Sequence, residues 1–292
     1  MANLTIWIWT LVALLGVISV DFYLAARKPR EVQIREAVLW VVFYVLLALG
    51  FAISLAFTLS RESSGEFVAG WLTEYSLSVD NLFVFLIIFS RLRVAKKSIQ
   101  TVLLIGIALA LVFRGIFITV GALLIHRFIW VFFVFGAFLL VTAARLLYKG
   151  GGDEDWKEGR AVAFFRRRRL GTFGIAVVAI GTTDLLFALD SIPAIFGLTQ
   201  DPYIVFTANA FALMGLRQLY VLLGGLVERL VHLSKGLAII LAFIGIKLIA
   251  EALVGVGVSV PQIGTALSLG VVVATLAITT IVSLKSSPKI EM

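Results

Sequence analysis

Two short acidic motifs lie inside long apolar stretches of this sequence. Each consists of an acid, five further residues, an aspartate and then an amide or hydroxyl residue: Glu74, Asp80 and Asn81 in the first, and Asp184, Asp190 and Ser191 in the second. A carboxylate in the middle of a membrane span costs about 2.5–3.5 kcal/mol to insert. Four such groups must therefore be protonated, paired with bases or bound to a cation.

The spacing of these polar residues groups them on helix faces. Residues seven apart return to one face of an α-helix, so Glu74, Ser78 and Asn81 are expected to align, as are Asp184 and Ser191. The chain has no cysteine, which leaves oxygen atoms as the ligands of such a site. Oxygen ligands favour hard divalent ions, with manganese, magnesium and calcium as the candidates.

Basic residues in other apolar stretches allow a second interpretation of the acids. They are Arg114, Arg145, Arg217 and Lys247. They could pair with the four acids to form a purely architectural core of ion pairs. Alternatively, they balance the charge of a cation site when it is empty. We favour the cation site, because each acidic helix carries more oxygen acceptors than ion pairing needs.

Three further residues bear on the site. Pro193 follows the second motif and is predicted to break its helix, since proline removes a hydrogen bond from the carbonyl four residues earlier. Asp21 is an outer candidate for the cation site. Glu251 is predicted to be the i,i+4 partner of Lys247.

The composition predicts an all-α, polytopic membrane helix bundle. Of the 292 residues, 61% are hydrophobic and only 14% are charged. The apolar residues form blocks of about 20, the length of a helix that crosses the hydrocarbon core. The sequence predicts nine spans, at approximately 4–25, 36–59, 66–90, 99–123, 128–149, 171–199, 202–224, 234–254 and 261–284.

The distribution of basic residues predicts the orientation of the spans. Basic residues gather in alternate loops, such as 27–35, 91–97 and 149–169, while the opposite loops hold Arg61 and Arg127. The positive-inside rule then places the N-terminus outside and the C-terminus in the cytoplasm. Membrane topology thus accounts for the net charge of +8, and no nucleic-acid partner is expected. The expected partners are a lipid bilayer and a divalent metal ion.

The two motifs predict an internal repeat within a single membrane domain, 1–292. The third to fifth spans (66–149) resemble the sixth to eighth (171–254), and a basic cytoplasmic linker at 150–170 joins them. A unit of three helices reverses its orientation on repetition. The expected architecture is therefore an inverted repeat, as in many secondary transporters.

The motifs EYSLSVDNLFVF at 74–85 and TTDLLFALDSIPA at 182–194 resemble signatures of the TerC family of integral membrane proteins. VDFYL at 20–24, FRG at 113–115 and ALMGLRQLY at 212–220 also match that family. The resemblance covers about residues 4–255. It implies export of manganese, in a family named for tellurium resistance. It implies metal-site roles for matched positions, namely Glu74, Asp80, Asn81, Asp184, Asp190 and Ser191.

We therefore expect a secondary transporter that exports divalent cations, foremost Mn²⁺, in exchange for protons, in the bacterial inner membrane. Neither an enzymatic activity nor a tightly bound cofactor is expected, since no catalytic constellation or phosphate-binding loop is visible. Two alternatives remain open. One is a membrane assembly or interaction protein with a structural acid–base core, and the other is a tellurite-resistance factor.

Overall fold

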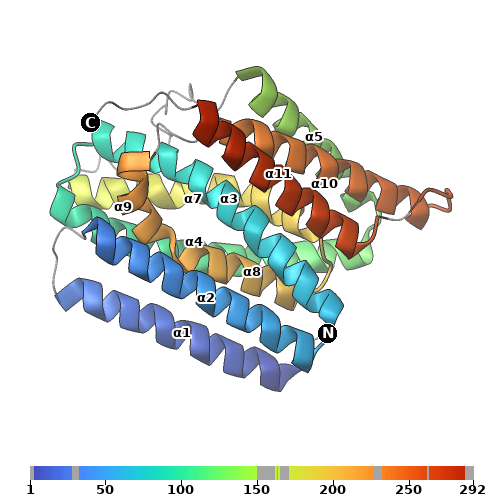
Figure 1. The fold of residues 1–292 in the computed structure, drawn as a ribbon, viewed down its shortest axis with the longest axis horizontal. Helices are drawn as coiled ribbons and strands as arrows, with labels where there is room; N and C mark the ends of the chain where they lie inside the picture. Colours follow the sequence, from blue (N-terminus) through green and yellow to red (C-terminus); the bar gives the residue numbers. More distant parts are fainter. Residues whose placement is uncertain are drawn as a thin grey trace.

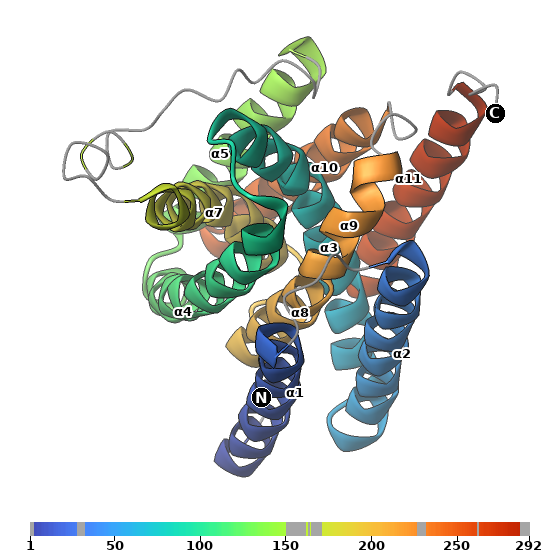
Figure 2. The ribbon, with the colours of Figure 1, turned by 90° about the vertical axis from the view of Figure 1, so that its left-hand side faces the viewer.

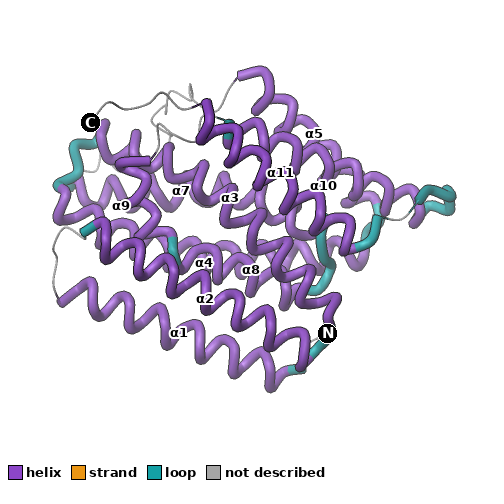
Figure 3. Tube along the Cα trace, in the orientation of Figure 1, coloured by secondary structure: helices purple, strands orange, loops and turns teal. Residues whose placement is uncertain are grey.

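The computed structural model describes residues 3–27, 33–149, 162, 164, 171–226, 232–261 and 263–286. The described secondary structure is helical throughout (Figure 3). The helices are α1 (Leu4–Arg27), α2 (Ile34–Thr58), α3 (Arg61–Arg91), α4 (Lys96–Arg127), α5 (Trp130–Lys149), α7 (Thr172–Phe196), α8 (Pro202–Met214), α9 (Leu216–Leu226), α10 (Leu233–Gly255) and α11 (Thr265–Ser286). The predicted all-α fold class is confirmed.

N-terminal capping residues mark the start of two of the central helices. Ser60 caps α3, with its hydroxyl accepting a hydrogen bond from the backbone N–H of Ser63 at 3.0 Å. Asp201 caps α8 by accepting from the backbone N–H of Tyr203 at 2.9 Å. Pro202 occupies the start of α8, where the missing N–H costs nothing.

Eight helical segments are long and apolar enough to cross a membrane, and the shorter apolar stretch Leu4–Val20 lies in α1. Together they correspond to the nine predicted spans. Consecutive spans run in alternating directions (Figure 1). The seventh predicted span comprises two helices, because α8 ends before Gly215 and α9 starts after it. The chain bends at this point (Figure 1).

The spans differ in how far they are buried by their neighbours. In the most apolar stretch of the α8–α9 span, 78% of residues are buried, against 17% in α11 and 22% in α2. Figure 2 shows α4 and α7 on one side, α2 and α11 on the other, and α3 and α8 between them. Exposed apolar side chains such as Leu15, Phe57 and Ile278 belong to the peripheral helices, as expected for contact with lipid. The chain is therefore a multi-span membrane protein with α3 and α8 at its centre.

Helices from the first half of the chain pack against helices from the second half. α3 packs on α8, α4 on α7, and α5 on α10. Each helix of the predicted first repeat thus has a close neighbour in the second repeat. The inverted symmetry itself stays a prediction, because pairing of neighbours does not define a rotation axis.

The predicted helix break at Pro193 is not found in the structure. Pro193 was expected to break its helix, but α7 continues through it and ends at Phe196, so this prediction is wrong. The proline lies one turn from the helix end, and Gly197 N–H still donates to the Pro193 carbonyl at 3.0 Å.

Within the predicted linker 150–170, only Val162 and Phe164 belong to the described residues. The role of the linker therefore stays untested.

Two glycines allow α5 and α10 to approach closely. A Cβ atom added to Gly136 would lie 2.8 Å from the Gly245 carbonyl oxygen and 2.7 Å from Ile249 Cγ1. A Cβ atom on Gly245 would lie 2.9 Å from the Gly136 carbonyl oxygen. Because the obstructing atoms include backbone, a side chain at either position must push the helices apart.

We expect Gly136→Ala to destabilise the protein by about 1–3 kcal/mol, the usual effect of overpacking. Gly50→Ala in α2 is the matched control, because a Cβ at Gly50 meets nothing within 4 Å. Thermal unfolding of both variants in detergent measures the difference. Equal melting temperatures would contradict the close packing of α5 and α10.

Candidate functional site

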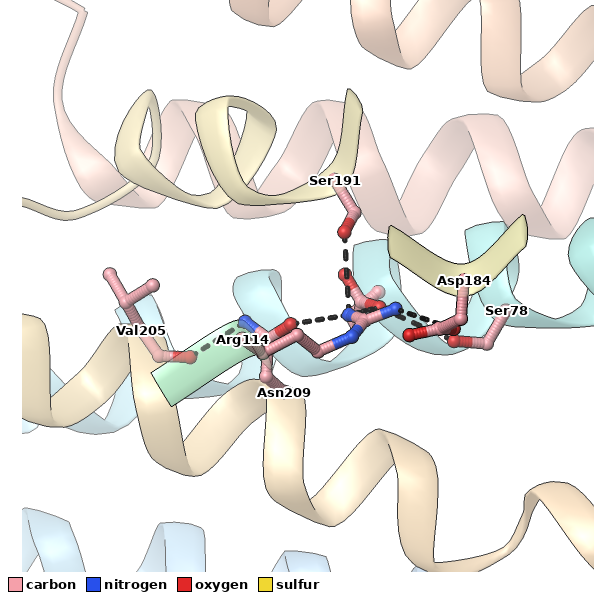
Figure 4. Close-up of polar contacts among 7 residues, drawn as sticks. Ser78, Arg114, Asp184, Ser191, Val205 and Asn209 are labelled. Atoms are coloured by element: carbon pink, nitrogen blue, oxygen red, sulfur yellow. Dashed lines mark hydrogen bonds and ion pairs between the residues drawn. The ribbon is translucent and has the colours of Figure 1, made fainter. Parts of the chain in front are cut away.

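A buried arginine lies where four helices meet. Arg114 is in the middle of α4 and has an exposed fraction of 0%. α4 packs on α7 and α8, and α3 packs on the same two helices. The side chains of all four helices thus converge on one guanidinium group (Figure 4). We call the set Glu74, Ser78, Arg114, Asp184, Ser191 and Asn209 the Arg114 cluster.

Nη1 of Arg114 has three oxygen neighbours from three helices. It donates to Glu74 Oε1 of α3, to Asn209 Oδ1 of α8 at 2.5 Å and to Ser191 Oγ of α7 at 3.3 Å. Nη2 lies 3.4 Å from Asp184 Oδ1, also on α7. The guanidinium group therefore links two carboxylates that are far apart in the sequence.

Two additional hydrogen bonds orient the oxygen atoms around Arg114. Ser78 Oγ donates to Glu74 Oε1 at 3.3 Å, one turn along α3. Asn209 Nδ2 donates to the carbonyl of Val205 at 2.8 Å (Figure 4). Since the amide nitrogen is held by the backbone, the amide oxygen faces the guanidinium group. The site is thus preorganised to present oxygen atoms.

The polar groups of the cluster are incompletely satisfied. Among the residues that the structure describes, Glu74 Oε2, Asp184 Oδ2 and Arg114 Nε are buried and have no hydrogen-bond partner. A buried ionised group without a partner is costly in free energy. When ionised, the two carboxylates carry two negative charges against the single positive charge of Arg114. The cluster therefore has spare capacity to bind a proton or a cation.

The ligand chemistry of the cluster is that of oxygen. Glu74 and Asp184 supply carboxylates, Asn209 an amide oxygen, and Ser78 and Ser191 hydroxyls. Such atoms are the ligands of hard cations such as Mn²⁺, Mg²⁺ and Ca²⁺. Within the described part of the chain, no three His, Cys, Asp or Glu residues lie together as a metal site. A site built from the described side chains therefore has at most two carboxylates and needs neutral oxygens as its other ligands.

The structure brings several of the predicted site residues together. Glu74, Asp184, Ser191 and Arg114 all belong to the cluster. Asn81 is half-buried on α3, less than one turn beyond Ser78. Three further predicted residues have side chains outside the described part of the structure: Asp80 on α3, Asp190 on α7 and Asp21 on α1.

The other three predicted charge-balancing residues lie on helices other than that of Arg114. Arg145 is exposed on α5, because this helix packs with Leu139 and Ala143 buried, which leaves Arg145 on another face. Arg217 is buried near the start of α9. Lys247 is buried on α10 and lies 3.8 Å from Glu251, which confirms the predicted i,i+4 pair. Arg145 and Lys247 are thus not part of the Arg114 cluster.

Asn209 is a member of the cluster that sequence reasoning missed. It lies in α8, within the apolar stretch PYIVFTANAFALM, and its exposed fraction is 1%. Its signal in the sequence was a single amide in an otherwise apolar part of a span. The repeated acidic motif gave no indication of it, because Asn209 lies outside both copies.

A second polar group ties the α7–α8 turn to α3 and α10. Thr199 Oγ1 donates to Glu66 Oε2 of α3 at 2.7 Å. The adjacent Gln200 donates through Nε2 to Glu251 Oε2 at 3.3 Å, and Glu251 pairs with Lys247. These contacts lie toward the end of the bundle where α3 begins. They connect the helices of the Arg114 cluster to α10.

A small cavity lies beside Asp184, between α3, α4, α7 and the first residue of α9. It is lined by Phe85, Leu103, Gly106, Ile107, Ala110, Ile180, Asp184 and Leu216. Asp184 is the only ionisable residue of this lining. On this side, the cluster therefore faces an apolar environment, which strengthens electrostatic interactions.

This fold and site define a polytopic membrane protein with a charged cluster buried between its central helices. The model of the integral membrane protein TerC family matches residues 59–289. The chain belongs to this family, which confirms the resemblance of the two acidic motifs. None of the solved structures matches the chain.

Relatives cover most of the chain. An uncharacterised membrane protein of Mycobacterium tuberculosis (strain H37Rv) is 41% identical over 97% of this chain and 79% of its own length. A membrane protein of Myxococcus xanthus is 36% identical over 83% of this chain and 82% of its own. The Escherichia coli K12 protein named "Putative membrane-bound redox modulator Alx" is 35% identical over 91% of this chain and 90% of its own.

We expect Thr199→Val to destabilise the protein by about 1–3 kcal/mol, because Glu66 loses its buried hydrogen-bond donor. Combining Thr199→Val with Glu66→Gln should cost less than the sum of the two single changes. Thr119→Val is the control, since Thr119 is exposed and its hydroxyl donates to the carbonyl of Gly115 in its own helix at 2.8 Å. Additive effects in chemical or thermal unfolding would show that the two residues are not coupled.

Proposed function

We propose that this protein is a secondary transporter that exports divalent metal cations from the cytoplasm, with Mn²⁺ as the foremost substrate. The observation that carries the proposal is the convergence of Glu74 and Asp184 on one buried site. These carboxylates come from different helices and are joined there by oxygens of Ser191 and Asn209. Each carboxylate also has one buried oxygen that finds no hydrogen-bond partner in the described part of the chain.

The free-energy cost of burying the carboxylates of Glu74 and Asp184 supports a functional role for them. Two carboxylates at mid-span cost about 5–7 kcal/mol on insertion scales when each costs 2.5–3.5. A single arginine leaves this burial incompletely compensated. Residues retained at such a cost commonly mark ion pathways in membrane proteins. A divalent cargo cation in place of the arginine would balance both carboxylates.

Proton exchange is the coupling that the same groups favour. Carboxylates must lose their protons before they bind a metal ion, so metal binding and protonation compete at the same atoms. Uptake of protons from one side then favours release of the metal ion there. The positive-inside distribution supports a bacterial inner-membrane orientation with the N-terminus outside, so that export moves cations from the cytoplasm.

We expect Glu74→Gln and Asp184→Asn each to reduce Mn²⁺ flux at least tenfold in proteoliposomes, because each removes one of the two carboxylate ligands. Glu62→Gln is the matched control: Glu62 is an exposed acid at the start of the same helix as Glu74. Flux is measured with a manganese-sensitive dye inside the vesicles, for Mn²⁺, Mg²⁺ and Ca²⁺ in parallel.

The outcome depends on the protein remaining folded in the membrane. Both changes replace a carboxylate by an amide of the same shape, and size-exclusion profiles report on folding. Folded Glu74→Gln and Asp184→Asn proteins with full Mn²⁺ flux would exclude this cluster as the transport site. Absence of flux for all three ions with the unmodified protein would favour an assembly or interaction role.

The name of the Alx relatives suggests a second candidate, modulation of the redox state. The chain contains no cysteine, so it has no thiol of its own for disulfide exchange. Any redox role must therefore act through another species. Control of a redox-active metal such as manganese is one such route, and it would make the two proposals compatible.

A further inference from the structure

We propose that Arg114 is an internal competitor of the transported cation: its guanidinium group occupies the cation position in the empty site and must leave that position before a metal ion binds. This inference rests on the proposed function and adds a mechanism of release to it. Arg114 would then act as a tethered substitute for the substrate. Its return would drive the metal ion out of the site.

The first argument comes from counting donors and acceptors at Nη1. Each terminal guanidinium nitrogen carries two N–H groups. Nη1 has three oxygen neighbours, Glu74 Oε1, Asn209 Oδ1 and Ser191 Oγ. The number of acceptors exceeds the number of hydrogens. Three oxygens from three helices around a single positive centre resemble part of a coordination shell more than a hydrogen-bonding site for arginine.

The second argument comes from the rest of the guanidinium group. Arginine usually binds carboxylates through two parallel N–H···O bonds. Here Arg114 contacts Glu74 through Oε1, Asp184 lies 3.4 Å from Nη2, and Nε has no hydrogen-bond partner among the described side chains. The arginine therefore does not use its fork geometry. The arrangement of oxygens is better matched to a point charge than to a planar group.

The third argument is mutual exclusion. A divalent cation binds oxygen atoms at about 2.0–2.6 Å. Glu74 Oε1 and Asn209 Oδ1 both contact Nη1, so a cation that uses these oxygens must take the space of Nη1. Two positive groups in one buried site would also repel each other strongly, because the local dielectric constant is low. Metal binding and arginine pairing are thus alternative states.

Competition between Arg114 and the metal ion has an observable consequence for metal affinity and for the rate of transport. Part of the metal-binding free energy of the unmodified protein is lost in displacing Arg114. Removing the arginine should tighten metal binding while slowing metal release, so that affinity and transport change in opposite directions. A purely structural arginine gives a different pattern, because its loss weakens both.

The test compares Arg114→Gln with the unmodified protein and with Arg127→Gln, an exposed arginine at the end of the same helix. Mn²⁺ affinity is measured in detergent by titration followed by electron paramagnetic resonance. Mn²⁺ flux is measured in proteoliposomes. We expect Arg114→Gln to bind Mn²⁺ at least tenfold more tightly and to transport it at least tenfold more slowly, with Arg127→Gln unchanged in both.

Arg114→Lys covers the case in which the glutamine variant does not fold. Lysine keeps the charge but is shorter and has one terminal nitrogen, so it cannot contact Asp184 together with the three oxygens around Nη1. We expect its Mn²⁺ affinity to rise by a smaller factor, about three- to fivefold, with flux reduced. Replacement of a merely structural arginine by lysine would leave affinity unchanged or lower it.

The possible failures separate the two proposals. Unchanged or weaker Mn²⁺ binding by the folded arginine variants, with normal binding by the unmodified protein, would overturn the competitor role and leave the transport function intact. Absence of Mn²⁺ binding by the unmodified protein and by both arginine variants would instead reject the metal-transport function, and with it this inference.

Discussion

The contact of one buried guanidinium group with oxygens from three other helices is the interaction on which this structure depends. Arg114 joins Glu74 of α3, Asp184 and Ser191 of α7, and Asn209 of α8. An unpaired charge inside a membrane protein is strongly unfavourable, and removing one partner of a buried ion pair costs more than the pair contributes. The packing of the four central helices is therefore constrained by electrostatics as well as by shape. Glu74 and Asp184 can be buried as carboxylates only beside a positive group, and in this structure that group is Arg114.

The helices at the periphery of the molecule are held by other contacts than buried ion pairs. α2 and α11 expose large apolar side chains and have few buried residues in their most apolar stretches. α5 and α10 instead approach each other through Gly136 and Gly245. In a bilayer, apolar side chains gain little by moving from lipid to protein, so close packing of small residues supplies the attraction. The polar centre and the glycine contact are thus two separate means of holding helices together where the hydrophobic effect between them is weak.

Much of the fold was predictable from the sequence, because apolar blocks of about 20 residues have few alternatives in a membrane. Glu74, Asp184, Ser191 and Arg114 were predictable for the same reason, since polar residues in such blocks are conspicuous. Other features depend on tertiary packing. The exposure of Arg145 follows from which face of α5 meets α10, and the contribution of Asn209 follows from the position of α8. A proline near a helix end can be tolerated, and α7 accordingly continues through Pro193.

The order of these contacts along the chain has a consequence for biosynthesis. Glu74 and Arg114 lie on α3 and α4, which follow each other in the sequence, whereas Asp184 and Asn209 belong to the second half. During insertion, the carboxylate of α3 and the guanidinium group of α4 are both in the membrane while the rest of the chain is still being translated. In the folded protein, α3 and α4 pack mainly on α7 and α8, and it is the side chain of Arg114 that reaches Glu74. Pairing of these two opposite charges lowers the cost of keeping them in lipid before α7 and α8 are made. The later arrival of α7 and α8 then converts a local neutralising contact into a site shared by both halves.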